Sequence, residues 1–441
     1  MSRKQSILRG TFILTATGFA TRIIGFFYRM FLSHTFGEEN VGLYQLIFPI
    51  YALCFSLTAA GFQTAIARTV AHKVSLEKPQ EARQIVKTGL LFSVSLSILA
   101  AIILQQNADM LSLRILGDAR CSSLLVVVSY ALPFAAIHSC ICGYYLGLRQ
   151  TQIPAVSQFV EQIIRVCAVF VIYQIALKKG TEISISFAVA GLVFGEISSA
   201  FYCINFFSKS GREPRVLSFL RQCSSNAREL ILLALPLTAN RVLLNLLQSV
   251  EAISIPLKLQ QYGLSSQDAL KMYGVLTGMA LPLILFPSAI TNSVSTMLLP
   301  AVTELTTTGR TENLKKIIRK VAGCCFVLGF ACCILFLLLG NLAGTYLFRS
   351  DLAGDFIVTM AWICPFLYMN STLISILNGL GKATTSFFIN TAGLLIRICG
   401  IWFVTPQVGI KGYLWGLLLS QLIVTVLCIF TVRRNMKASR A

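Results

Sequence analysis

The sequence predicts an all-α polytopic membrane protein with twelve transmembrane helices in two pseudo-symmetric lobes of six helices each. Composition is the first reason: 56% of the 441 residues are hydrophobic and only 12% are charged, whereas a soluble domain carries about 25% charged residues. A fold in water could not cover this much apolar surface. The second reason is a series of long apolar segments, and the third is an internal repeat.

The apolar segments are each long enough to cross a bilayer as a helix, which takes about 20 residues. Mean hydropathy over the whole chain is +0.75. Twelve segments qualify: 10–32, 41–67, 85–105, 123–147, 154–177, 184–207, 229–256, 273–300, 317–339, 355–379, 384–404 and 410–432. We number them as spans 1 to 12.

The basic residues of the loops predict the orientation. If the N-terminus is cytoplasmic, the cytoplasmic segments hold 24 of the 37 Lys and Arg residues, the external loops hold eight, and five lie within spans. Cytoplasmic loops of membrane proteins are enriched in Lys and Arg. We therefore expect a multi-pass protein of the plasma membrane with both termini in the cytoplasm. The same topology accounts for the net charge of +20 without a nucleic-acid partner.

An internal repeat divides the chain into two lobes. At a shift of 232 the second half matches the first, as in the pairs Pro133 and Pro365, Gly147 and Gly379, Arg165 and Arg397, and Cys167 and Cys399. A shift of 225 aligns Glu196 with Gln421, and spans 1 and 7 align more loosely. We predict lobes at 1–207 and 229–441 joined by a cytoplasmic linker, 208–228. Parallel repeats of this kind place a substrate site between them, near the midplane.

Four arginines lie near the middle of predicted spans. Arg22, Arg165, Arg241 and Arg397 are eleven to thirteen positions from the cytoplasmic ends of their spans, a depth of about 16–20 Å at about 1.5 Å per residue. Facing lipid, each would cost about 2.5–3.5 kcal/mol. They must therefore face the protein interior or pair with an acid.

Polar side chains accompany these arginines at helical spacing. On span 7, Thr238, Arg241, Asn245 and Gln248 share one helical face. On span 1, Arg22 and Arg29 lie along a similar line, and on span 11 Asn390 is seven positions before Arg397. We interpret these stripes as the lining of a water-filled cavity. The candidate substrate-binding residues are Arg22, Arg29, Arg165, Arg241, Asn245, Gln248 and Arg397.

Acidic residues are fewer in the spans. Glu161 lies four positions before Arg165, and Glu196 lies in the middle of span 6. Glu161 and Glu196 are the candidates for ion coupling or ion pairing, and Glu161 is expected chiefly as a partner of Arg165. The central site would carry a net positive charge and attract an anion, for which the planar guanidinium group suits phosphate. Alternatively, Arg165 and Arg397 tie helices together through backbone carbonyls. His138 is expected to be a packed or hydrogen-bonded core residue rather than a proton relay.

Motifs of soluble enzymes are absent from the sequence. It has no G-x-x-x-x-G-K-[ST] nucleotide-binding loop and no His-Glu-x-x-His zinc motif. The 14 cysteines lie mostly inside apolar segments, where free cysteine behaves as a small hydrophobic residue. The sequence therefore predicts no catalytic residues, no metal site and no cofactor.

Three segments carry a family resemblance: TRIIGFFYRMFLSHTFGEENVGLYQLIFPIY (21–51), AAGFQTAIAR (59–68) and AVSQFVEQIIRVCAVF (155–170). They resemble the stage V sporulation protein B group of polysaccharide-biosynthesis flippase-like proteins. This group belongs to the multidrug/oligosaccharidyl-lipid/polysaccharide (MOP) exporter superfamily, whose MATE-like core has twelve spans in two lobes. Arg22 matches a cavity arginine of the superfamily's lipid II flippases through its context, Thr21-Arg22 followed by Gly25-Phe26. Arg241 resembles a cavity arginine of these flippases only in its predicted depth and in the helix on which it lies.

The resemblance implies a flippase that moves a lipid-linked, pyrophosphate-bearing oligosaccharide or peptidoglycan precursor across the membrane by alternating access. Its expected partners are this anionic substrate, membrane lipids and a coupling ion, H⁺ or Na⁺. One alternative is a cation-coupled multidrug exporter of the MATE type, which would need buried carboxylates in its lobes. Another is a scaffold that recruits cell-wall synthesis proteins.

Overall fold

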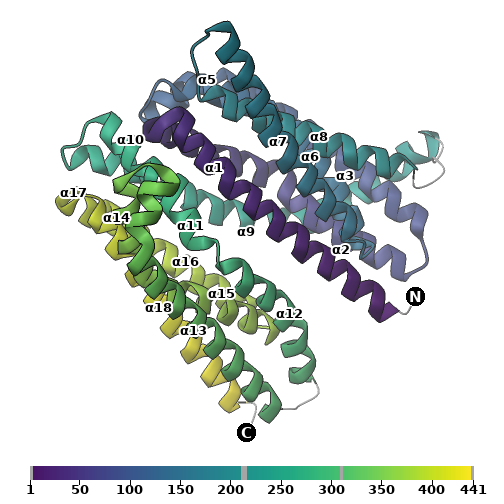
Figure 1. Ribbon diagram of the computed structural model, residues 1–441. Coiled ribbons are helices and arrows are strands. Elements are labelled where there is room, and N and C mark those ends of the chain that lie inside the picture. Colours follow the sequence, from purple (N-terminus) through teal and green to yellow (C-terminus); the bar gives the residue numbers. More distant parts are fainter. Residues whose placement is uncertain (1–2, 210–215, 308–310, 439–441) are drawn as a thin grey trace. The chain divides into compact units, whose positions relative to one another are not determined.

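The computed structural model describes residues 3–209, 216–307 and 311–438, and every regular element in these ranges is helical (Figure 1). The first half contains α1 (Arg3–Phe55), α2 (Gly61–Ser75), α3 (Pro79–Gln106), α4 (Ala108–Leu111), α5 (Cys121–Ser129), α6 (Ala131–Gly147), α7 (Gln152–Lys179) and α8 (Ser186–Lys209). The second contains α9 (Val216–Gln261), α10 (Ser266–Gly274), α11 (Leu281–Leu285), α12 (Ser288–Thr307), α13 (Thr311–Ala343), α14 (Asp351–Met360), α15 (Cys364–Gly379), α16 (Ala383–Cys399), α17 (Thr405–Val408) and α18 (Ile410–Ala438). The all-α prediction is confirmed.

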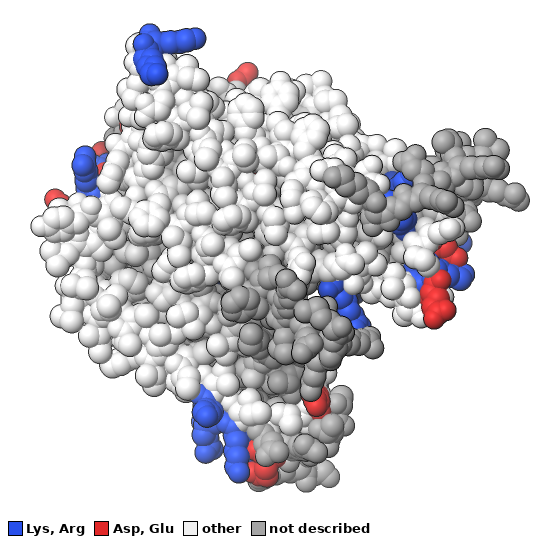
Figure 2. Space-filling model, turned by 45° about the vertical axis from the view of Figure 1, so that its right-hand side comes forward, with Lys and Arg blue, Asp and Glu red and all other residues white. Residues whose placement is uncertain are grey.

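Within the described residues, ten helices are long and apolar enough to cross a membrane, or eleven if the bent pair α5 and α6 forms one span. Predicted span 2 and most of predicted span 1 fall within one of them, Ala16–Ser75. The chain breaks inside it at Gly37, whose φ of +80° is outside the helical range. Figure 2 shows few charged side chains across the middle of the face it presents. A multi-pass membrane protein is therefore confirmed, whereas the count of twelve stays a prediction.

Local chemistry explains where several helices begin and end. The Ser265 hydroxyl accepts a hydrogen bond from the Asp268 amide at 3.1 Å and begins α10. Ser350 does the same for Ala353 at the start of α14. Such caps contribute about 1 kcal/mol each because they satisfy amides that lack a partner in the first turn. At the other end of α7, Gly180 takes a φ of +62°, which glycine adopts at little cost.

Breaks in the helices recur at regular offsets, as the residues of the repeat do. The π-helical turn Ser112–Leu116 has a counterpart in Gly344–Phe348, at the shift of 232 already found in the sequence. The turn Ser56–Ala60 has one at the start of Val275–Ala280, at a shift of 219. The bend between α5 and α6 corresponds to a 3₁₀ turn, Ala361–Ile363. These irregularities come from backbone geometry, so they support the repeat independently of residue identity.

The chain forms two compact units. Unit 1 consists of residues 1–28 and 43–249, and unit 2 of residues 29–42 and 250–441. In unit 1, α6 packs against α2, α3 and α8, and α7 packs against α8. In unit 2, α15 packs against α12, α13 and α18, and α16 packs against α18. The two units thus have the same helix packing, with α2, α3, α6, α7 and α8 equivalent to α12, α13, α15, α16 and α18.

The division into units falls within α1 and α9. The predicted division is the linker 208–228, of which residues 210–215 lie outside the described residues, while α9 is helical from Val216. Residues 29–42 belong to unit 2 because Gly42 lies against the backbone of α10. A Cβ atom at Gly42 would lie 2.9 Å from the Leu270 carbonyl carbon and closer still to its oxygen. Only a glycine permits this approach.

Replacing Gly42 with alanine should therefore destabilise the protein by about 1–3 kcal/mol, because the added methyl group meets backbone that cannot rotate away. Gly18, on the same helix, has nothing within 4 Å of its would-be Cβ. Gly18→Ala should be neutral or stabilising by up to about 1 kcal/mol. Thermal unfolding of the detergent-purified variants measures both. Equal shifts in the two variants would contradict the close contact.

Candidate functional site

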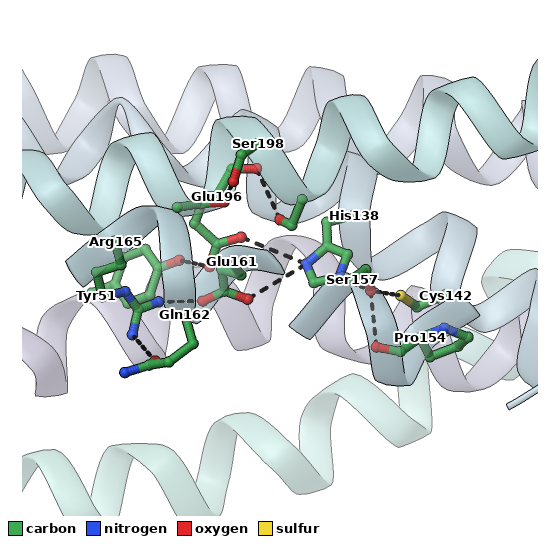
Figure 3. Close-up of polar contacts among 12 residues, drawn as sticks. Tyr51, His138, Cys142, Pro154, Ser157, Glu161, Gln162, Arg165, Glu196 and Ser198 are labelled. Atoms are coloured by element: carbon green, nitrogen blue, oxygen red, sulfur yellow. Dashed lines mark hydrogen bonds and ion pairs between the residues drawn. The ribbon is translucent and has the colours of Figure 1, made fainter. Parts of the chain in front are cut away.

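A cluster of polar side chains lies inside unit 1, among α1, α6, α7 and α8 (Figure 3). The helix α7 presents Ser157, Glu161 and Arg165 at successive spacings of four, which places them on one face. His138 comes from α6 and Glu196 from α8. Four of these side chains are only 12–18% exposed. Hydrophobic spans thus bring two acids, an arginine and a histidine together in a largely buried place.

Small residues on α8 allow this approach. A Cβ atom at Gly195 would lie 3.0 Å from the Glu161 carbonyl oxygen and 3.3 Å from the Arg165 Cβ atom. A larger side chain at this position would push α8 away from α7. Because Gly195 precedes Glu196, the close contact also carries the Glu196 carboxylate to the neighbourhood of Glu161.

The contacts within the cluster are specific. Arg165 forms an ion pair with Glu161, the partner predicted from their spacing. The imidazole Nε2 of His138 lies 2.9 Å from the Ser157 hydroxyl. Its Nδ1 atom lies 3.7 Å from Glu196 Oε2 and 4.0 Å from Glu161 Oε2. One ring nitrogen of His138 therefore faces both carboxylates while the other contacts Ser157 (Figure 3).

Glu196 is incompletely satisfied. Its Oε1 atom accepts a hydrogen bond from the Tyr51 hydroxyl at 3.2 Å, but its buried Oε2 atom accepts none from any described residue. Buried polar atoms without a partner are rare because each costs about 1–3 kcal/mol. With neutral His138 the cluster carries a net charge of −1, from Glu161, Glu196 and Arg165. One bound cation, or a proton on His138, would neutralise it.

The equivalent place in unit 2 is built from amides. The shift of 232 pairs His138 with Asn370, and the shift of 225 pairs Glu196 with Gln421. The Asn370 amide donates to Gln421 Oε1 at 2.8 Å, and the Thr425 hydroxyl donates to Asn370 Oδ1 at 2.7 Å. Unit 2 thus has an uncharged polar contact between α15 and α18, the helices equivalent to α6 and α8, where unit 1 has a charged one.

Arg397 is neutralised in a different way from Arg165. Its Nη1 atom lies 3.2 Å from Oε1 of Glu251, a residue of α9 whose side chain is 9% exposed. The Tyr413 hydroxyl donates to the same oxygen at 3.2 Å. The position equivalent to Glu161 is Gly393, which lines a pocket of about 230 Å³ together with Arg397, Asn390 and Gln421.

Glu251→Gln should destabilise the protein by about 3–5 kcal/mol, because it leaves the partly buried Arg397 guanidinium group without its counter-charge. The double variant Glu251→Gln/Arg397→Gln should recover much of this loss, since it removes both charges together. Thermal unfolding of both variants is the measurement. A double variant that is less stable than the single one would contradict the pairing.

The remaining predicted substrate-binding residues lie in other surroundings. Arg22 on α1 is exposed. Arg241 on α9 is also exposed, and its Nη2 atom donates to the Thr64 hydroxyl at 3.1 Å. Arg29 belongs to unit 2, where its Nη1 atom lies 3.5 Å from the Thr277 carbonyl oxygen. Asn245 is half-buried and Gln248 is exposed. The arginines therefore form two classes: Arg165 and Arg397 are paired with acids, whereas Arg22 and Arg241 present exposed guanidinium groups.

Sequence reasoning missed His138, Tyr51 and Glu251 as members of these clusters. The repeat offers a signal for His138, because its alignment with Asn370 parallels that of Glu196 with Gln421. No comparable signal marks Glu251, whose partner Arg397 is distant in the sequence. Ligand atoms of His138, Glu161 and Glu196 all lie within 4.8 Å of one another, as do those of His138, Cys142 and Cys203. These are the donor groups that could hold a cation in the described part of the chain.

Two curated proteins of known name are similar to this chain in sequence over most of its length. Stage V sporulation protein B of Bacillus subtilis (strain 168) is 28% identical over 99% of this chain and 85% of its own length. Lipid II flippase MurJ of the same organism is 23% identical over 89% of this chain and 76% of its own length.

Solved structures share the fold. An inward closed conformation of lipid II flippase MurJ superimposes with a TM-score of 0.75 at 14% identity, covering 96% of this chain and 87% of that one. An inward-facing MATE family multidrug resistance transporter of the MOP superfamily gives a TM-score of 0.70 at 14% identity, covering 96% and 95%. The predicted resemblance to this superfamily is confirmed. The family model described as "Polysaccharide biosynthesis protein" matches residues 7–306, and the chain belongs to this family.

Proposed function

We propose that this protein is a flippase that moves an anionic, pyrophosphate-bearing lipid-linked oligosaccharide or peptidoglycan precursor across the plasma membrane by alternating access. The family to which the chain belongs supports this role, as do the names of two relatives, a lipid II flippase and a sporulation protein. The chemistry is transport, with no covalent change in the substrate.

The observation that carries the proposal is the exposure of Arg22 and Arg241 within hydrophobic spans. Each lies about 18 Å along its span from the predicted cytoplasmic end, at about 1.5 Å per residue. A guanidinium group that faces lipid at that depth is unfavourable by about 2.5–3.5 kcal/mol. Exposure there is favourable only along an aqueous path, where both groups could bind the phosphate groups of a substrate.

The cluster around Glu161, Glu196 and His138 is the proposed coupling site for H⁺ or Na⁺. With His138 neutral, the net charge of −1 and the unsatisfied Glu196 Oε2 atom favour uptake of one cation. A buried net charge is costly in a protein surrounded by lipid, so the occupied and empty states of this site should differ in their preferred conformation. Binding of one ion can thereby bias the transport cycle.

Both termini are proposed to lie in the cytoplasm, from the three-to-one bias of basic residues. A reporter that is active only in the cytoplasm should therefore be active when fused after Ala441. A reporter inserted at Asp118, in the predicted external loop after span 3, should be inactive in the cytoplasm-specific assay. A reporter that is inactive after Ala441 and active at Asp118 would show that the predicted orientation is wrong, although the fold would remain as described.

Reconstitution tests the function directly. Proteoliposomes containing the purified protein should accelerate the transfer of a labelled polyprenyl-pyrophosphate-linked sugar between leaflets, measured by its accessibility to an external modifying enzyme. A polyprenol that lacks the pyrophosphate serves as control and should not be transferred faster than in protein-free vesicles. Equal transfer of both lipids would reject recognition of the anionic group.

A cation-coupled exporter of cationic drugs is the second candidate, and one observation favours it. Such an exporter would need buried carboxylates, and the fold brings Glu161 and Glu196, which the sequence places on separate spans, together in one largely buried cluster. Efflux of a cationic fluorescent dye from cells or vesicles tests this candidate. Gradient-driven efflux that is lost in Glu196→Gln would favour it over the flippase.

A further inference from the structure

A groove of about 870 Å³ lies within unit 2, outside the two polar clusters. It is formed at the N-terminal end of α13 and the C-terminal end of α18, near the C-terminus in Figure 1, with α15 behind them. Its volume is within the range of about 300–1,000 Å³ that is usual for ligand sites. Its apolar wall includes Ile318, Phe326, Met369, Leu373, Ile429 and Phe430.

The charges of the groove are all of one sign and lie at one end. Its lining includes Lys315, Arg319, Arg433 and Arg434, and none of the described residues that line it is acidic. Lys315 also contacts Glu312, an acid of its own helix that does not line the groove, at 3.5 Å. Both helices change from apolar to basic toward the same end: α13 starts there and α18 finishes there. The groove is therefore amphipathic, with an apolar body and a cationic mouth.

The length of the groove matches one leaflet of a bilayer. From Lys315 to Phe326 it extends along eleven positions of α13, about 16 Å at about 1.5 Å per residue. Half of a hydrocarbon core of about 30 Å is about 15 Å. An acyl chain lying in the apolar body would thus place its headgroup at the basic mouth.

Unit 1 closes the equivalent place with its own side chains. Arg83, the counterpart of Lys315, donates to the Phe207 carbonyl oxygen at 2.8 Å and lies over the Phe207 ring at 5.0 Å. This contact joins α3 to α8. In unit 2 the residue equivalent to Phe207 is Val432, which offers no aromatic ring to a cation.

Gly323 keeps the groove open. Its counterpart in unit 1 is Leu91, whereas a Cβ atom at Gly323 would have nothing within 4 Å. Unit 2 therefore differs from unit 1 here in two ways: it has glycine where unit 1 has the exposed Leu91, and it has no counterpart of the arginine–aromatic contact that joins α3 to α8. The difference between two copies of one unit singles out the groove as a specialised site.

We propose that the groove binds an anionic glycerophospholipid of the surrounding bilayer, with an acyl chain along Gly323 and Phe326 and its phosphate at Arg319, Arg433 and Arg434. Basic pockets between membrane helices are suited to anionic headgroups because the arginine fork donates paired hydrogen bonds to phosphate. The lipid would join α13 to α18, as the Arg83–Phe207 contact joins α3 to α8 in unit 1. The site does not depend on what the protein transports.

The test uses the full-length protein purified in a neutral detergent, with lipid binding followed by native mass spectrometry and by the thermal unfolding midpoint. Phosphatidylglycerol should bind at least tenfold more tightly than phosphatidylcholine and raise the midpoint. Arg319→Gln/Arg434→Gln should lose this preference. Gly323→Phe keeps all four basic residues but fills the groove, so it should lose phosphatidylglycerol binding as well. Gly323→Ala should retain it.

The matched control is Lys316→Gln/Lys320→Gln, which removes two charges from the same turns of α13 at positions that do not line the groove. If it weakens binding as much as Arg319→Gln/Arg434→Gln, the effect is general surface charge and the proposal fails. Inorganic phosphate that reproduces the whole stabilisation would reduce the site to a free-anion site and also overturn it. So would a polyprenyl-pyrophosphate-linked sugar that displaces phosphatidylglycerol at equal concentration, because the groove would then belong to the transport substrate.

Discussion

Transfer of a pyrophosphate-bearing lipid should fall by about 100-fold or more when Arg22 and Arg241 are both replaced by glutamine. Hydrogen bonds to charged groups contribute about 1.5–3 kcal/mol each, so the loss of one such bond at each position removes about 3–6 kcal/mol. A factor of ten in rate corresponds to about 1.4 kcal/mol. The initial rate of transfer between leaflets of proteoliposomes measures the effect. The protein itself should stay stable, since both side chains are exposed.

Two comparisons separate charge from geometry in this experiment. Arg22→Lys/Arg241→Lys keeps the charge but loses the paired donors of the guanidinium group, so transfer should be intermediate. Arg114→Gln removes an exposed charge outside the predicted spans and should leave transfer unchanged. A double glutamine variant as active as the wild type would remove the anion-binding role from these residues, while the membrane fold would remain.

The two carboxylates of unit 1 should respond in opposite ways to the loss of their charge. Glu161→Gln leaves Arg165 without its ion-pair partner in a largely buried place, and should destabilise the protein by about 3–5 kcal/mol. With His138 neutral, Glu196→Gln instead brings the net charge of the cluster from −1 to zero. Unit 2 already carries an amide, Gln421, at the equivalent position. Glu196→Gln should therefore fold normally but no longer respond to a proton or sodium gradient.

This contrast is measured by thermal unfolding and by transport with and without an imposed gradient. Gln421→Ala is the control in unit 2: it removes a neutral hydrogen bond to Asn370 and should cost stability without changing the response to the gradient. Transport by Glu196→Gln that keeps the full gradient response would place ion coupling elsewhere. His138→Gln should show the same uncoupling as Glu196→Gln, because His138 Nδ1 faces the Glu196 carboxylate.

The ion pair of Arg165 with Glu161 could be predicted from the sequence because both residues lie on one helix. A spacing of four fixes the separation of two side chains wherever the helix packs. The contact of Arg397 with Glu251 could not be predicted in this way. Its two residues come from different helices, and their approach depends on how the chain packs α16 beside Glu251 within unit 2.

The position of His138 illustrates the same limit. Its own helix is apolar, and a lone histidine in such a segment resembles a core residue. Its contacts with Glu161 and Glu196 join three helices, and Gly195 allows two of them, α7 and α8, to approach closely. The groove beside Gly323 likewise needed the fold, because the sequence shows a glycine there but not the open space around it.

The sequence by itself determined the membrane fold, the repeat and the family, and it predicts the depth of the arginines. These follow from local properties: a bilayer of fixed thickness requires apolar helices of known length, and every backbone polar group in lipid must be satisfied within the helix. The tertiary structure decided which arginines are neutralised, where the acids meet and where a groove stays open. Those features depend on contacts between helices distant in sequence, and such contacts are set by the packing of small residues at their interfaces rather than by the hydropathy of any one helix.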